Sequence, residues 1–481
     1  MVLSGYEPKK VLEFFEMLSA VPRGSGNEEG ISKFLEKFAK DRNLYCVRDE
    51  ANNIIIKKPA SKGYENSPAV ILQGHMDMVC EKAAGVEHDF LKDPIKVKVE
   101  NGFIRAEGTT LGADNGIAVA YCMALLDDDT IEHPPVEVVL TTDEETGMSG
   151  AKALNASLLE GRMLMNIDSE EEGQFLVSCC GGRRANIKIP VTRKAEPGFK
   201  TVSLFIGGLK GGHSGGEIHL QRANANKLMG RVLREAFNAA DIRIISMAGG
   251  SVDNAITRDC CAFLAVKADD VQAVKDTAEK MAAILTDEYR NIEDKVVITV
   301  TENETTLLPV TKDDTLKLIR VINLIPYGVQ AMCTDIEDLV ETSSNLGIIN
   351  TEEDCFTFSN STRSSIESRK DMLCNIMADI AGIAGGSIVT YNDYPGWEFN
   401  PDSKLLKLFK ETYVELYGKE PVVTAMHAGV ECGLFAQKIP GIDMISFGPD
   451  MYDVHTPEER ISIESIGSVW NYIKAVLRNM K

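Results

Sequence analysis

Two histidines and several carboxylates follow apolar runs that predict β-strands, and side chains of these types can hold metal ions. The run AVIL leads into His75 and Asp77, VEVVL into Asp143, Glu144 and Glu145, MLMNI into Asp168, and MISFG through a turn into His455, while Asp114 precedes a predicted helix. The carboxyl ends of strands in an open α/β sheet form its binding crevice. Buried acids are costly unless they are paired or bound to a cation. The grouping therefore predicts a cation site at one edge of a sheet.

The types of these residues limit which metals the site could hold and which reactions it could catalyse. Imidazoles and carboxylates without thiolates suit Zn, Mn or Co better than Ca or Mg. Their wide separation along the chain excludes a helical HExxH motif, and it fits two metals about 3.5–4 Å apart that share a carboxylate. Glu144 and Glu145 are expected on opposite sides of an extended segment, so that one binds metal and the other acts as a base. Asp77 shares a face with His75 and is expected to hold its imidazole.

The elements that must position these residues alternate between strand and helix over the first 184 residues, which predicts an α/β sheet. The alternating segment VKVENGFIRAEG, with Asn101-Gly102 at its centre, predicts a hairpin. From about Arg184 the pattern becomes α+β, and it changes again at YNDYPGWEFNPD. Amphipathic helices are expected in this middle region at 219–237, 269–290, 312–325 and 365–384. We therefore predict one α/β domain interrupted by an inserted α+β domain.

Composition bears on the compartment and on the partners. The 481 residues carry 51 Lys+Arg and 72 Asp+Glu, a formal net charge of -21. This acidity argues against nucleic acid or an anionic membrane as a partner, because both attract basic patches. The N-terminus does not resemble a signal peptide, and no apolar run reaches the length of a membrane helix. Eleven cysteines without a CxxC pair fit reduced thiols. A cytoplasmic protein is expected.

Five motifs in this order resemble the co-catalytic zinc exopeptidase family, which includes dipeptidases, tripeptidase T, carnosinases and acylase-type deacetylases. They are GHMDMV, LGADNGIAVA, TTDEETGMSGA, NIDSEEEG and HTPEERI, and the resemblance covers essentially the whole chain. The segments GGHSGGEIH and HAGVECGLF resemble most the cytosolic Xaa-His dipeptidases (aminoacyl-histidine dipeptidase, peptidase D). The resemblance implies a catalytic domain at 1–184 and 395–481, with a mixed sheet flanked by helices, and an inserted lid domain at 185–394.

The resemblance also implies a role for each matching residue of the metal site. Asp114 would bridge two divalent ions, Zn in the first place with Co or Mn as alternatives. His75 and Asp168 would complete one site, and Glu145 and His455 the other. Glu144 would be the general base. It would take a proton from a water that bridges the metals and so form the attacking hydroxide. The Asp114–Asn115 peptide would be cis.

Three residues of the insert match lid residues of the family, and a glycine after the insert matches a backbone contact beside the site. His213, in GGHSGG, would polarise the scissile carbonyl and stabilise the oxyanion. Asn254 and Arg363 would contact substrate, and the Arg363 guanidinium suits a C-terminal carboxylate. Gly429 would supply a backbone contact. The resemblance allows a homodimer or a large lid that completes the site alone.

Several activities remain open within this resemblance. Aspartate at position 168 favours a peptidase over a deacylase, and the implied substrates are unblocked dipeptides, either Xaa-His of the carnosine type or a broad range. A tripeptidase or an N-acyl amino-acid deacylase uses the same chemistry. A catalytically silent binding protein on this fold is the alternative from another class, and the complete ligand set with Glu144 argues against it.

Overall fold

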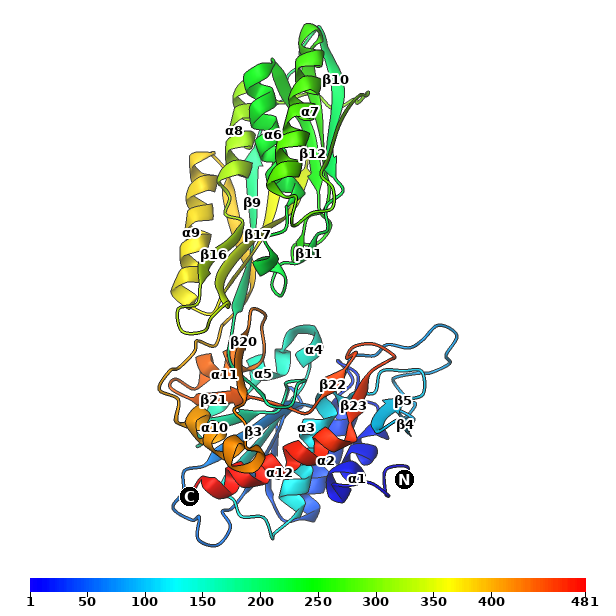
Figure 1. The fold of residues 1–481 in the computed structure, drawn as a ribbon, viewed down its shortest axis with the longest axis vertical. Coiled ribbons are helices and arrows are strands. Elements are labelled where there is room, and N and C mark those ends of the chain that lie inside the picture. The colour runs from blue at the N-terminus through cyan, green and yellow to red at the C-terminus, as the bar shows by residue number, and fades with distance from the viewer. The chain divides into compact units, whose positions relative to one another are not determined.

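An eight-stranded mixed sheet forms the centre of the first of two units into which the chain folds. The computed structural model describes residues 1–481, and Figure 1 shows its elements. The first unit comprises Met1–Ser178, Phe399–Ala425 and Val430–Lys481, and the second comprises Cys179–Glu398 and Met426–Gly429. All of the residues 185–394 lie in the second unit.

The central strands of the first sheet are parallel and buried. In spatial order the sheet contains β1 (Tyr45–Arg48), β2 (Ile54–Lys58), β6 (Val136–Thr141), β3 (Val70–His75), β7 (Met163–Asn166), β21 (Asp443–Ser446), β8 (Gln174–Cys179) and β20 (Val422–Met426). Strand β3 pairs in parallel with β6 and β7, and β7 with β21. Every residue of β3 and β6 is buried, as expected for parallel strands covered on both faces.

Each of the longer helices of this unit buries its apolar side chains. They are α1 (Lys9–Ser19), α2 (Glu29–Asp41), α3 (Ala113–Asp127), α10 (Lys404–Tyr417) and α12 (Ile463–Asn479). Helix α3 is buried almost all round, because it packs against both α1 and strand β3. No helix of the chain combines the length and the apolar character that a membrane span needs.

An aromatic cluster joins the three segments of the chain that form the first unit. Phe175 in β8 lies with its ring centroid 5.4 Å from that of Phe409 in α10 and 5.7 Å from that of Tyr472 in α12. Tyr413 packs edge-on against both Phe175 and Tyr472. Contacts of this kind bury large apolar surface, so they hold the C-terminal segment against the N-terminal one.

The predicted hairpin around Asn101-Gly102 is confirmed. Strands β4 (Val97–Glu100) and β5 (Phe103–Ala106) pair antiparallel, and Glu100 faces Phe103. Both turn residues have positive φ, 52° for Asn101 and 82° for Gly102, which is the requirement of a two-residue type I′ turn. Strands β22 (Met451–Tyr452) and β23 (Arg460–Ser462) extend this small sheet.

The second unit is a nine-stranded sheet with helices packed on it. The strand order is β15 (Val297–Glu302), β10 (Phe199–Gly207), β14 (Cys260–Lys267), β12 (Ile242–Gly249), β17 (Val340–Thr351), β18 (Cys355–Ser364), β9 (Gly181–Pro190) and β19 (Ser387–Tyr394), with β16 (Gly328–Met332) paired to β17. One apolar core joins this sheet to its helices. Figure 1 shows α6 between α7 and α8.

The helices predicted for the insert are present, with one corrected boundary. They are α6 (Ala225–Ala239), α7 (Val271–Glu288), α8 (Lys312–Leu324) and α9 (Glu367–Ile383). The helix expected at 219–237 begins only at Ala225. The reason is local: Gln221 has a φ of 52°, and the Asn224 side chain accepts a hydrogen bond from the Lys227 N–H as an N-cap.

Candidate active site

Three adjacent parallel strands end at the place where the predicted ligands lie. Strand β3 ends at His75, which faces Thr141 at the end of β6. Strand β7 ends at Asn166, two residues before Asp168. Because the strands are parallel, their carboxyl ends meet at one edge of the sheet.

Asp114 lies between the two imidazoles of the site. Its Oδ1 is 3.1 Å from His75 Nε2, and its Oδ2 is 3.1 Å from His455 Nε2. On the first side, Asp168 Oδ1 is 3.4 Å from His75 Nε2. On the second side, Glu145 Oε2 is 3.0 Å from His455 Nε2. The arrangement forms two sets of donors, each with one imidazole and one further carboxylate, that share Asp114.

The chemistry of these donors fits divalent cations. Ligand atoms of His75, Asp114 and Glu145 all lie within 4.8 Å of one another. Glu145 Oε1 is buried and has no hydrogen-bond partner. Nitrogen and oxygen donors in such small sets leave coordination positions for water or substrate, as catalytic zinc sites do.

Asp77 supports both the imidazole and the loop that carries the two glutamates. Its carboxylate accepts hydrogen bonds from the Ser25 hydroxyl at 2.8 Å and from the N–H groups of Glu144 at 3.2 Å and Glu145 at 3.3 Å. Its Oδ1 also lies 3.3 Å from His75 Nδ1. This contact favours a proton on Nδ1, so Nε2, which faces the other carboxylates, is the nitrogen that a cation would use.

Glu144 and Glu145 do not lie in an extended segment, which corrects the sequence-based expectation. They begin a one-turn helix, α4 (Glu144–Gly147), after Asp143 with a φ of 56°. The change has a physical cause: the Asp77 carboxylate accepts the free N–H groups of the first helical turn. The two side chains still point in different directions, because consecutive residues of a helix are about 100° apart.

Burial and neighbouring charges raise the pKa values of some residues of the donor sets and lower those of others. Burial raises the pKa of Glu144 to about 9 and that of Asp168 to about 6. Burial also opposes ionisation of Asp114, but hydrogen bonds with His455 and His75 lower its pKa. Hydrogen bonds to Asp114 and Glu145 raise the pKa of His455 to about 11. Protons thus balance the charge of this cluster, and a divalent cation would displace them on binding.

Glu459 and Arg23 hold the loop of Asp114, and sequence reasoning missed both. The Glu459 carboxylate accepts four backbone N–H groups, those of Leu111, Gly112, Ala113 and Asp114, at 2.7, 3.0, 2.7 and 3.3 Å. The buried Arg23 guanidinium donates to the carbonyls of Met76, Asp77 and Gly112. Glu459 lies in the HTPEER motif, which could have indicated it, whereas nothing in the sequence around Arg23 did. The Asp114–Asn115 peptide is cis, as the resemblance implied.

The predicted lid residues form a second cluster, within the second unit. The Gly216 N–H donates to His213 Nδ1 at 3.0 Å. A neutral His213 ring therefore carries its proton on Nε2, where it can donate to a carbonyl oxygen. Partial burial and the charge of Arg363 lower the pKa of His213, which favours this neutral form. The Ser214 N–H donates to the backbone carbonyl of Asn254, which ties Asn254 to the same loop.

Arg363 and Gly429 meet at Tyr394, a residue that sequence reasoning did not select. Arg363 Nη1 donates to the Tyr394 hydroxyl at 3.0 Å. A Cβ atom at Gly429 would lie 2.6 Å from the Tyr394 ring, so only glycine fits there. A Cβ at Gly215 would lie 3.0 Å from His213 Cε1 and 3.1 Å from Arg363 Cζ. Gly215 therefore brings the histidine and the arginine close together.

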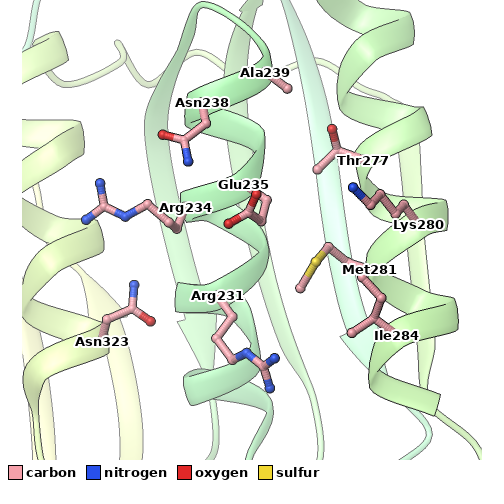
Figure 2. Close-up of a pocket in the computed structure, with 10 residues that line it drawn as sticks. All are labelled: Arg231, Arg234, Glu235, Asn238, Ala239, Thr277, Lys280, Met281, Ile284 and Asn323. Atoms are coloured by element: carbon pink, nitrogen blue, oxygen red, sulfur yellow. The ribbon is translucent and has the colours of Figure 1, made fainter. Parts of the chain in front are cut away.

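Figure 2 shows a groove between helices α6, α7 and α8 of the second unit. Side chains such as Arg231, Glu235 and Lys280 line it. None of the residues predicted for metal binding, catalysis or substrate contact is among its lining residues.

Replacing Glu459 should destabilise the first unit. Glu459→Ala removes the acceptor of four backbone N–H groups, and each buried donor left unpaired costs about 1–3 kcal/mol. We expect a fall of about 2–4 kcal/mol in the free energy of unfolding, since part of the loop can rehydrate. Urea unfolding followed by circular dichroism measures it. Glu458→Ala is the control, because that neighbouring side chain is 76% exposed. Equal urea midpoints for the two variants would contradict the anchoring role.

Comparison with known proteins identifies the family. The profile of peptidase family M20/M25/M40 matches residues 71–479. The chain is 37% identical over 482 residues to a cytosol non-specific dipeptidase of Escherichia coli (strain K12), covering 99% of both chains.

Solved structures agree with this match. A crystal structure of aminoacylhistidine dipeptidase from Vibrio alginolyticus superposes with a TM-score of 0.95 at 38% identity, covering 99% of this chain and 97% of that one. The aminopeptidase PepT from Bacillus cereus, at 16% identity and a TM-score of 0.57 over 99% of both chains, shares the fold. The five motifs, the fold and these matches together make the chain a member of peptidase family M20/M25/M40.

Proposed function

We propose that this protein is a metal-dependent dipeptidase that hydrolyses unblocked dipeptides, with Xaa-His peptides of the carnosine type among its substrates. The observation that carries the proposal is the pair of donor sets that share Asp114, with Glu144 close enough to feel the charges of His75, Asp168 and Glu145. The relatives support the substrate class, since both the Escherichia coli and the Vibrio alginolyticus proteins are named as dipeptidases.

The proposed ligands are His75, Asp114 and Asp168 for one ion and Asp114, Glu145 and His455 for the other. Zinc suits these donors best, and cobalt and manganese are the alternatives. Bound ions of this kind lower the pKa of water and polarise the scissile carbonyl. Asp77 keeps His75 oriented through Nδ1.

Glu144 is the proposed general base and acid. It takes a proton from the attacking water and then delivers it to the leaving amine. Its backbone N–H is held by Asp77, so the side chain starts from a fixed position. Burial raises its pKa to about 9, and the negative charges of Asp168, Glu431 and Glu145 add to the rise. Positive charge nearby would bring this pKa down towards the range useful for a base.

The lid cluster is proposed to bind the rest of the substrate. His213 donates from Nε2 to the carbonyl oxygen as negative charge develops there. Arg363, held by Tyr394, pairs with the C-terminal carboxylate. Asn254 and the backbone at Gly429 contribute further contacts.

The proposed setting is the cytoplasm, with a dipeptide as the partner and no nucleic acid or membrane. The net charge of -21 supports the exclusion of polyanions, and the name of the Escherichia coli relative supports the compartment. The proposal accommodates a homodimer as well as a lid that completes the site alone.

A substrate panel tests the activity. Protein loaded with zinc, manganese or cobalt should cleave Xaa-His and other unblocked dipeptides faster than tripeptides or N-acetyl amino acids. Release of free amino acid measures the rates. Faster cleavage of tripeptides or of N-acetyl amino acids would replace the proposal by a tripeptidase or a deacylase. Complete inactivity of fully metallated protein would indicate a silent binding protein.

Loss of the Glu144 carboxyl should remove turnover and leave the metals bound. A general acid–base group contributes about 10²–10⁴-fold to rate, so Glu144→Ala should lower kcat by at least about 10²-fold. Metal content and kcat are measured on the same sample. Glu160→Ala, whose side chain is 82% exposed, is the control. Retained turnover in Glu144→Ala would end this assignment.

The two histidines should be needed for metal retention. His75→Ala and His455→Ala each remove one nitrogen donor from a different set, so each should lower the metal content by about one ion per chain. Elemental analysis of dialysed protein gives the number. His88→Ala serves as the control, because His88 is outside both donor sets. Two ions retained by either variant would contradict the ligand assignment.

A further inference from the structure

A fully buried carboxyl group, Glu431, lies in the first unit and has no part in the proposed chemistry. Its Oε2 accepts hydrogen bonds from Gln73 Nε2 at 2.6 Å and from the Thr141 hydroxyl at 2.7 Å. Its Oε1 is buried without a hydrogen-bond partner. Glu431 precedes helix α11 (Cys432–Lys438) but makes no side-chain cap to it. Its contacts are therefore with the sheet and not with its own helix.

These contacts reach the ends of three adjacent strands. Gln73 is in β3, two residues before His75, and Thr141 ends β6, just before the loop of Glu144. Gln73 Oε1 in turn accepts from Asn166 Nδ2, at the end of β7 and two residues before Asp168. Gln73 and Asn166 are also direct neighbours in the strand register. One carboxyl group thus joins Thr141 to Gln73 in a series of side-chain hydrogen bonds that spans all three strands.

A carboxyl group is a costly choice for this position. Burial raises the pKa of Glu431 to about 7, with Asp168 adding to the rise and His75 opposing it. A buried polar atom without a partner costs free energy. An apolar side chain would avoid the cost, but it would remove the short hydrogen bonds of the Gln73 amide and the Thr141 hydroxyl. Only the longer bonds would remain, from Gln73 to Thr141 Oγ1 at 3.2 Å and from Thr141 to the Gly74 carbonyl at 3.3 Å. The acceptor is therefore what the position requires.

We propose that Glu431 is a positioning residue, which fixes the spacing of the three strand ends that carry His75, Asp168 and the Glu144–Glu145 pair. It acts through Gln73 and Thr141 and does not touch the ions or the substrate. This inference rests on the proposed metal site, because the quantity that it sets is the distance between the donors of that site.

The affinity for Zn²⁺ alone tests it, measured by competition with a chromophoric chelator. Loss of partners behind metal ligands typically costs about 10–100-fold in metal affinity, so we expect a loss in this range for Glu431→Ala. Glu431→Gln keeps an oxygen that accepts both hydrogen bonds, and it should recover most of that affinity.

Glu137→Ala is the matched control. Glu137 lies at the opposite end of the same strand, β6, and is also buried, accepting the N–H groups of Glu160 and Gly161. Its loss should lower the unfolding temperature and leave Zn²⁺ affinity within about twofold of the wild type. A general loss of stability would instead lower the affinity of both variants equally, which would overturn the inference.

The outcomes separate this inference from the proposed function. Equal Zn²⁺ affinity of wild type and Glu431→Ala overturns the positioning role alone. Wild-type protein that binds no divalent ion overturns the metal site and the inference with it. If Glu431→Ala does not fold, Glu431→Asp takes its place, because it withdraws the carboxylate by one methylene group. A loss of at least about 10-fold supports the role, and unchanged affinity refutes it.

Discussion

Carboxyl groups that are buried close together lose hydration and repel one another, and the first unit is built around this constraint. Asp114 is the clearest case, since each of its oxygens faces an imidazole at 3.1 Å. The loop that carries it is held by the Glu459 carboxylate from one side and by the Arg23 guanidinium from the other. Asp77 holds His75 and the start of α4. Each anchor reduces the freedom of a donor, so little ordering remains when a cation binds.

The parallel sheet places these charged side chains together at one of its edges. Strand ends at one edge bring side chains together that are far apart along the chain, and the edge itself is formed by backbone that is already hydrogen-bonded. The lid cluster uses a different device. There the Gly216 N–H selects one tautomer of His213, and glycine at positions 215 and 429 leaves room for Arg363 and Tyr394. The first unit thus orients carboxylates and imidazoles, and the second orients the hydrogen-bond donors His213 and Arg363.

The sequence predicted much of the fold and of the candidate site, because the relevant signals are local. Short apolar runs indicated the central strands, and the alternating segment around Asn101-Gly102 indicated the hairpin. The start of α6 was misplaced by six residues, since apolar periodicity continues through a turn that Gln221 and the Asn224 cap interrupt. The extended segment at Glu144 was wrong because Asp77, distant in sequence, stabilises a helical turn there.

The sequence by itself determined which residue types stand at the strand ends, and therefore the kind of site. The reason is that a strand is predicted from its own residues, and the residues that follow it can then be read from the sequence. The family resemblance already paired His455 with Glu145 and His75 with Asp168, and the tertiary structure places the paired atoms 3.0 Å and 3.4 Å apart. Only the tertiary structure revealed Glu459, Arg23 and Glu431 as supports. The contacts of these three residues depend on the register between strands and on loops that are far apart in the sequence. Tertiary packing, and not local conformational preference, brings such segments together.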